Sequence, residues 1–199
     1  MKIGVFGGTF DPIHNGHIVL AETARETLEL DEIIFIPAGV PWLKSEQNIS
    51  QACHRMAMVK LVVNYRPHFS ISDIEIRREG PSYMADTLSE IHATVESGTA
   101  LYLITGMDSI LDLGRWHKPQ RVLELCTLVT VSRPGFPEFN SKVLERIRMG
   151  ASGALVQLDA PLIDISGTEI RTRLSQGLPI STLVPALVEH YIFSKKLYV

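Results

Sequence analysis

The sequence has 199 residues, is 45% hydrophobic and carries a formal net charge of −3 at neutral pH. That length and apolar content suit the core of one domain better than the cores of two. A charge so close to zero argues against a general surface for nucleic acid or a membrane, so any anion site must be local.

Strand-like and helix-like stretches alternate along the chain, which is typical of a parallel sheet covered by helices. In chain order we expect a strand over residues 2–6, a helix over 18–28, a strand over 32–37, a helix over 51–63, a strand with one solvated face over 69–76, and a helix over 83–95. The second half predicts strands over 100–105, 126–132 and 154–158, a charged helix over 141–148, a helix that begins near residue 166, and a helix over 184–195. The pattern predicts an α/β fold with a doubly wound, mostly parallel, Rossmann-like sheet, as a single domain over residues 1–199.

Residues 7–17, G-G-T-F-D-P-I-H-N-G-H, connect the first strand to the first helix. In an open α/β sheet such a turn lies at the carboxyl end of a strand, where ligands bind. The paired glycines Gly7 and Gly8 let the backbone approach a ligand, and the helix N-terminus attracts phosphate. The imidazoles of His14 and His17 can stabilise negative charge that develops on a phosphate. The turn therefore predicts a nucleotide site.

A second segment, residues 165–171, has the sequence I-S-G-T-E-I-R. Ser166 and Glu169 have the spacing of a capping box, and an ordinary capped helix would explain both residues. Hydroxyls and free N–H groups at a helix N-terminus also bind phosphate, and Arg171 lies one turn further as a charged donor. The two interpretations are compatible.

Two more segments combine polar and aromatic side chains. Asp108 follows a predicted strand and could accept hydrogen bonds from ribose, while Trp116 offers a flat face to a heteroaromatic ring. A helix cap and core packing would explain these two residues equally well. The segment P-S-Y-M-A-D-T-L over residues 81–88 includes Tyr83, and a helix start with a buried tyrosine would explain it nearly as well.

The block G-G-T-F-D-P-x-H-x-G-H resembles the signature of nucleotidyltransferases that join ATP to a phosphate-bearing acceptor. It is most similar to that of the bacterial nicotinate-nucleotide adenylyltransferases. The resemblance implies the nucleotidyltransferase form of the Rossmann-like fold and adenylyl transfer from ATP to nicotinate mononucleotide in NAD biosynthesis, giving deamido-NAD and pyrophosphate. It also implies that the second histidine, His17, reaches the triphosphate. No Asp/Glu cluster in the sequence resembles a protein metal cage, so we expect no protein metal site and a Mg²⁺ ion that arrives with ATP.

The other segments resemble motifs of the same family and extend the implied site. The implied catalytic residues are His14, His17, Lys44 and Arg171. The residues implied to bind ATP are Gly7, Gly8, Thr9, Phe10, Gly106, Asp108, Arg133, Ser166 and Thr168. The residues implied to bind the pyridine mononucleotide are Lys44, Tyr83, Thr87 and Trp116.

The sequence departs from the family pattern at two places. Gly167 stands where a second serine is usual, and Trp42-Leu43 stands where Pro-His is usual before the lysine. Two further residues lack a clear motif: Arg55 is either a substrate-side cation or a surface charge, and His117 is expected on the solvated surface. Asp11 is expected to hold the turn rather than to act on a substrate.

Other functions remain as alternatives to this interpretation. The same chemistry could use nicotinamide mononucleotide, or less favourably phosphopantetheine, and a catalytically silent nucleotide sensor would share the ATP site. A dehydrogenase is excluded because the first turn lacks G-x-G-x-x-G. Cys53 and Cys126, with no signal peptide, favour reduced buried thiols and a cytoplasmic location. We expect ATP and nicotinate mononucleotide as partners, with neither nucleic acid nor membrane; a homo-oligomer is left open.

Overall fold

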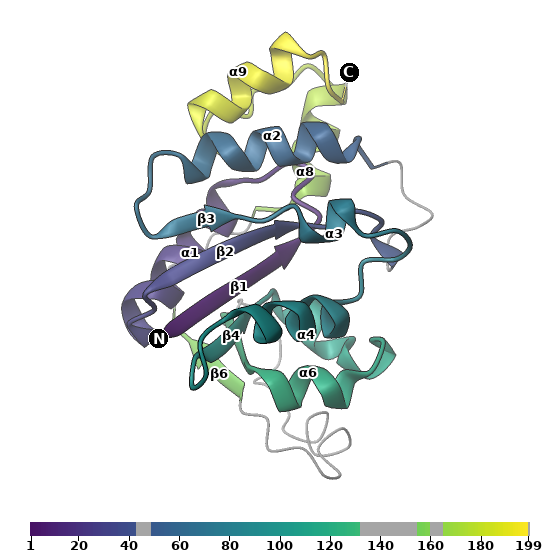
Figure 1. Cartoon of the computed structure of the whole chain (residues 1–199). Helices are drawn as coiled ribbons and strands as arrows, with labels where there is room; N and C mark the ends of the chain where they lie inside the picture. The colour runs from purple at the N-terminus through teal and green to yellow at the C-terminus, as the bar shows by residue number, and fades with distance from the viewer. Residues whose placement is uncertain (43–48, 132–154, 160–164, 199) are drawn as a thin grey trace.

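The computed structural model describes residues 1–42, 49–131, 155–159 and 165–198, with the side chain of Asp108 excepted (Figure 1). In these ranges a single parallel sheet has the strand order β3-β2-β1-β4-β5-β6. Its strands are β1 (Lys2–Gly8), β2 (Glu32–Pro37), β3 (Phe69–Ile71), β4 (Ala100–Ile104), β5 (Thr127–Val131) and β6 (Leu155–Leu158). The parallel, doubly wound sheet expected from the sequence is confirmed.

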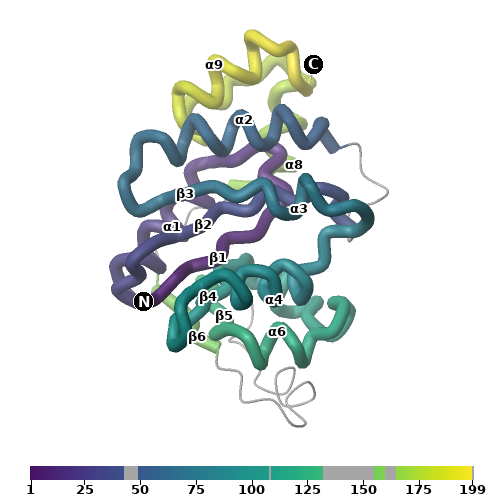
Figure 2. The backbone as a smooth tube through the Cα atoms, in the orientation of Figure 1, coloured from purple at the N-terminus to yellow at the C-terminus, as the bar shows by residue number. Residues whose placement is uncertain are grey.

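Helices cover both faces of this sheet, as the cartoon and tube views show (Figures 1 and 2). One face packs against α1 (Asn15–Leu28), α2 (Ala52–Val63), α8 (Gly167–Ser175) and α9 (Ala186–Ser194). The other face packs against α4 (Met84–Thr94), α5 (Met107–Leu111), the 3₁₀ turn η2 (Leu113–Arg115) and α6 (Pro119–Leu125). Within the described ranges, no helix has both the length and the apolar character needed to cross a membrane.

The central strand β1 explains why the core has two halves. Phe6 packs on the face of α1 and α2, whereas Ile3 and Val5 pack on the face of α4. Successive side chains of a strand point to opposite faces, so a strand covered by helices on both sides reads as a continuous apolar run. The run K-I-G-V-F therefore follows from the position of β1 in the middle of the sheet.

The strand order reverses between β1 and β4, because the chain first builds β2 and β3 on one side of β1 and then returns to build the other side. In open α/β sheets, ligands bind outside the carboxyl ends of the strands at such a reversal. The turn over residues 7–17 follows β1, and Gly106 follows β4. The topology therefore brings the turn over residues 7–17 and the segment that begins at Gly106 to the same edge of the sheet.

The strand expected over residues 69–76 is partly wrong. Only Phe69–Ile71 forms β3; a short helix, α3 (Ile74–Arg77), follows. The Ser72 hydroxyl accepts a hydrogen bond from the backbone N–H of Ile74 at 3.3 Å and so favours a turn there. The alternation predicted a solvated position for Glu75, but in α3 its side chain lies in the protein interior.

Other expected elements compare with the structure as follows. Helices α5 and α6 and the turn η2 were not predicted, because each is too short for a clear period of 3.6 residues. The helix expected over residues 141–148 lies outside the described residues.

Both cysteines are free, as expected, but only Cys126 is buried; Cys53 is exposed. Burial raises the pKa of the Cys126 thiol to about 12.

Candidate active site

The turn between β1 and α1 is anchored by Phe10. This residue has a left-handed backbone (φ 51°), and its side chain is 2% exposed. The ring packs edge-on against Phe6 and His17, with centroid distances of 5.5 and 5.1 Å. The side chain of Phe10 thus belongs to the core, so only its backbone could face the ATP that the sequence assigned to it.

The two histidines at the start of α1 are fixed relative to each other. Their rings lie 3.6 Å apart between centroids and 30° from parallel. The backbone N–H of His14 donates to Nδ1 of His17 at 3.2 Å. Because Nδ1 accepts, a neutral His17 carries its proton on Nε2 and can donate it. His14 is buried and His17 half-buried, so His17 is the better placed of the two to contact a ligand.

The start of α8 docks directly on this turn, although the two segments are far apart in the chain. Arg171 Nη1 donates to the backbone carbonyl of Asp11 at 2.7 Å, and Nη2 donates to Thr168 Oγ1 at 3.2 Å. A Cβ on Gly167 would lie 2.9 Å from the same Asp11 carbonyl oxygen, so the close contact explains the glycine that departs from the family pattern. The structure therefore brings the first two sequence motifs together.

Ser166 acts as the N-cap of α8. Its hydroxyl accepts a hydrogen bond from the backbone N–H of Glu169 at 3.1 Å, as the capping-box spacing predicts. Both Ser166 and Thr168 are exposed at the start of this helix. The cap and an anion at the helix N-terminus remain compatible, because the cap uses only one of the N–H groups there.

Arg55 is neither the surface charge nor the substrate-side cation that the sequence left open. Its side chain is buried, and Nε, Nη1 and Nη2 donate to the carbonyl oxygens of Ser50 (2.9 Å), Thr9 (2.9 Å) and Gly39 (3.2 Å). Burial lowers the pKa of the guanidinium, and the negative charge of Asp11 opposes this effect. Arg55 therefore joins the turn after β1 to the loop after β2.

The loop after β2 also contacts the start of α4. The Ser82 hydroxyl accepts hydrogen bonds from the backbone N–H groups of Gly39 (2.9 Å) and Val40 (3.2 Å). The ring of the next residue, Tyr83, lies between Trp42 (5.7 Å, edge-on) and His117 (4.2 Å, stacked). His117 is half-buried and belongs to an aromatic cluster with Tyr83 and Trp42, so it is a partly solvated histidine with one face stacked on a ring.

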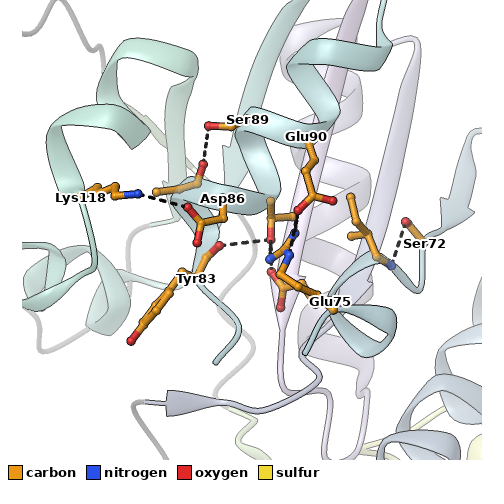
Figure 3. Close-up of polar contacts among 11 residues, drawn as sticks. Ser72, Glu75, Tyr83, Asp86, Ser89, Glu90 and Lys118 are labelled. Atoms are coloured by element: carbon orange, nitrogen blue, oxygen red, sulfur yellow. Dashed lines mark hydrogen bonds and ion pairs between the residues drawn. The ribbon is translucent and has the colours of Figure 1, made fainter. Parts of the chain in front are cut away.

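A polar network that includes the buried Glu75 and Thr87 lies next to Tyr83 (Figure 3). Thr87 is fully buried; its hydroxyl donates to Glu75 Oε1 at 2.7 Å and accepts from Arg78 Nη1 at 3.0 Å. Burial raises the pKa of Glu75, and hydrogen bonds from Thr87 and Ser82 partly offset this rise. The Thr87 side chain supports α4 from inside the protein, so the structure does not present it to the pyridine mononucleotide that the sequence assigned to it. Sequence reasoning missed Glu75, because its isoleucine neighbours suggested a strand.

We expect Gly39→Ala to lower the free energy of unfolding by about 1–3 kcal/mol, the usual cost of overpacking. A Cβ at position 39 would lie 2.2 Å from the carbonyl oxygen of Glu75, and backbone cannot move aside as a flexible side chain can. Urea unfolding measures the effect. Gly114→Ala is the matched control, since a Cβ there would meet nothing within 4 Å. Equal stabilities of the two variants would contradict the prediction.

Where the structure describes them, the other predicted site residues lie apart from the hydrogen-bonded contacts described above. Trp116 is half-buried against the α4 face of the core, and among the described residues its buried indole N–H has no hydrogen-bond partner. Gly106 is half-buried after β4, and Asp108 lies in α5. Lys44 and Arg133 lie outside the described residues. The described part of the chain holds no group of three or more His, Cys, Asp or Glu side chains that could bind a metal ion.

This fold and this turn define a class. The model of the cytidylyltransferase-like family matches residues 5–173, so the chain is a nucleotidyltransferase of that family. Similar chains include probable nicotinate-nucleotide adenylyltransferases of Dehalococcoides mccartyi (43% identical, covering 100% of this chain and 97% of the relative) and Thermomicrobium roseum (39% identical, covering 99% and 91%). Within the class, the chain belongs to the nicotinate-nucleotide adenylyltransferase family, as the sequence motifs implied.

A solved structure agrees with this assignment at the level of the fold. Nicotinic acid mononucleotide adenylyltransferase of Plasmodium falciparum, complexed with NaAD, superimposes with a TM-score of 0.76 at 20% identity, covering 99% of this chain and 97% of that one. The same protein complexed with APC gives a TM-score of 0.75. The Rossmann-like nucleotidyltransferase fold expected from the sequence is confirmed.

Proposed function

We propose that this protein transfers the adenylyl group of ATP to nicotinate mononucleotide, giving deamido-NAD and pyrophosphate for NAD biosynthesis. The observation that carries the proposal is the docking of α8 on the turn over residues 7–17, where Arg171 Nη1 lies 2.7 Å from the Asp11 carbonyl. This contact joins a charged donor on α8 to the turn that carries His14 and His17, which supports the proposed ATP site. Family membership supports the choice of acceptor.

On the ATP side, the proposed chemistry needs positioning and charge stabilisation rather than a covalent enzyme intermediate. An oxygen of the acceptor's 5′-phosphate attacks the α-phosphorus in line, and the bond to the pyrophosphate oxygen breaks with its electron pair leaving on that oxygen. Nε2–H of His17 and the guanidinium of Arg171 stabilise the charge that develops on the phosphates.

The other proposed ATP contacts surround these two residues. His14 fixes His17, and the turn backbone together with the α8 N-terminus supplies further N–H donors. The proposed set comprises Gly7, Gly8, Thr9, the backbone of Phe10, Gly106, Asp108, Arg133, Ser166 and Thr168. Mg²⁺ bound to the triphosphate would add charge neutralisation, and this ion is proposed to arrive with ATP.

On the acceptor side, we propose that the pyridine ring binds near Tyr83 and Trp116. Tyr83 belongs to the aromatic cluster with Trp42 and His117, and Trp116 directly precedes His117. Lys44 is proposed to contact a phosphate as a point charge, and Thr87 to support this region from beneath through Glu75.

We expect Trp116→Ala to raise the KM for nicotinate mononucleotide about tenfold, because base–aromatic stacking contributes about 1–3 kcal/mol per ring. The KM for ATP should change by less than about twofold, since the indole does not stack on adenine in this proposal. Steady-state kinetics with each substrate varied in turn measures both constants. Tyr65→Ala, which removes an aromatic ring that is 74% exposed after α2, is the control. Equal changes in the two KM values would remove Trp116 from the acceptor site.

The experiment that tests the function is pyrophosphate release from ATP and Mg²⁺ with three acceptors offered separately. Strong release with nicotinate mononucleotide and little with nicotinamide mononucleotide is expected. Preference for the amide would correct the acceptor, and release with phosphopantetheine alone would overturn the acceptor half of the proposal. ATP binding without release for any of the three would identify a nucleotide sensor.

The proposal includes the cytoplasm as the location, because unpaired thiols are typical of a reducing compartment. We propose no nucleic acid and no membrane as partners of this protein. A single domain over residues 1–199 remains a prediction, and a homo-oligomer is left open.

A further inference from the structure

The segment after α9 returns to the turn that follows β1. Its path is fixed by a Schellman motif: Lys196 is left-handed (φ 50°), its N–H donates to the Phe193 carbonyl at 3.2 Å, and the N–H of Leu197 donates to the Ile192 carbonyl at 3.0 Å. Leu197 and Tyr198 then pack against the core on the α1 and α2 face. In Figures 1 and 2 the marked chain end accordingly lies above α8 and the start of α2.

Tyr198 makes a short hydrogen bond to the active-site turn. Its hydroxyl donates to Asp11 Oδ1 at 2.6 Å, and Asp11 is 6% exposed. The other carboxylate oxygen, Oδ2, accepts from the backbone N–H of Ser50 at 3.3 Å. Burial raises the pKa of Tyr198, and the hydrogen bond to Asp11 raises it further, so the hydroxyl keeps its proton and remains a donor.

Asp11 is also the residue on which Arg171 is seated. Arg171 Nη1 donates to the Asp11 backbone carbonyl, but its distance to the Asp11 carboxylate oxygen Oδ2 is 4.0 Å. The carboxylate therefore lies just outside hydrogen-bond distance of the guanidinium. At 4.0 Å the two groups form only a long ion pair. A carboxylate without its hydroxyl partner could rotate by a small angle and accept a direct hydrogen bond from the guanidinium, and that bond would compete with a phosphate for the same donors.

We propose that Tyr198 is a positioning residue for ATP: its hydroxyl holds the Asp11 carboxylate away from Arg171 and so keeps the guanidinium available to the phosphates. The inference rests on the proposed role of Arg171 at the ATP phosphates. It assigns to Asp11 and Tyr198 no contact with either substrate. A generic structural role for Tyr198 would instead loosen both substrate sites together.

The test is Tyr198→Phe, which keeps the ring that packs against the core and removes only the hydroxyl. If the freed Asp11 carboxylate takes one charge-assisted hydrogen bond of Arg171 away from ATP, the KM for ATP should rise about tenfold. The KM for nicotinate mononucleotide should change by less than about twofold. Tyr191→Phe is the matched control, because the Tyr191 hydroxyl makes a comparable hydrogen bond from α9 to His54 Nδ1 at 2.9 Å. The control should leave both KM values unchanged, and urea midpoints should show whether each variant is folded.

A double-mutant cycle with Asp11→Asn provides an independent arm. An asparagine carries no charge to pair with Arg171, so Tyr198→Phe should change the KM for ATP by less than about twofold in that background. An unchanged KM for ATP in the single variant, equal changes for both substrates, or the same effect with and without the Asp11 charge would each overturn the proposal.

The proposed function is tested separately in the same assay. The unmodified protein should release pyrophosphate, and Arg171→Ala should raise the KM for ATP. If both hold and Tyr198→Phe behaves like the unmodified protein, only the role of Tyr198 is wrong.

Discussion

His17→Ala is expected to lower kcat by about 10²–10³, the usual loss when one donor to developing negative charge is removed. His17 is half-buried, and its Nδ1 accepts the backbone N–H of His14 at 3.2 Å, so its Nε2–H has a defined direction. The ring also packs edge-on against Phe10. We therefore expect a large loss of turnover and only a small loss in the free energy of unfolding. Steady-state kinetics measures the first, and urea unfolding measures the second.

Two further variants sharpen the test of His17. His17→Gln retains an N–H donor without an imidazole and should recover part of the lost turnover, because the donor rather than a proton transfer is proposed to act. His190→Ala, which removes an exposed imidazole on α9, should leave kcat unchanged. Normal turnover of His17→Ala would exclude this histidine from the mechanism.

Arg55→Ala is expected to lower the free energy of unfolding by about 3–5 kcal/mol, because removal of a buried charged donor leaves its partners unpaired. The guanidinium donates to the carbonyls of Ser50, Thr9 and Gly39 at 2.9, 2.9 and 3.2 Å. Those carbonyls would lose their partner in a space that a methyl group does not fill. Urea unfolding of the purified variant measures the loss.

Lysine is the informative second substitution at position 55. It retains the charge, but its single ammonium cannot reproduce the planar fork that reaches three carbonyls, so Arg55→Lys should recover only part of the stability. Arg121→Ala is the control: its guanidinium is half-exposed and pairs with Glu124 on the same helix, so the expected change is below about 0.5 kcal/mol. A loss in Arg55→Ala no larger than that of the control would show that the buried network contributes little.

The sequence alone determined the features that depend on neighbouring residues. The run K-I-G-V-F predicts β1 because a strand buried on both faces needs apolar residues throughout. The block over residues 7–17 predicts the turn between β1 and α1 because its glycines, its histidines and the following helix are contiguous. Ser166 and Glu169 predict the start of α8 for the same reason, and the structure has Ser166 as N-cap.

The tertiary structure decided what joins these segments. Tyr198 and Asp11 are hydrogen-bonded across 187 residues of sequence, and Arg171 and Asp11 across 160. No local period encodes which distant carbonyl or carboxylate a side chain will meet. In the sequence, Arg55 cannot be told from any other helical arginine, and only the fold surrounds it with three backbone carbonyls. Likewise, the sequence pattern puts Glu75 on the polar side of a strand, whereas the fold puts Thr87 beside it. The types of group in this site could therefore be predicted from sequence, whereas their partners depend on how the sheet and its helices bring distant segments into contact.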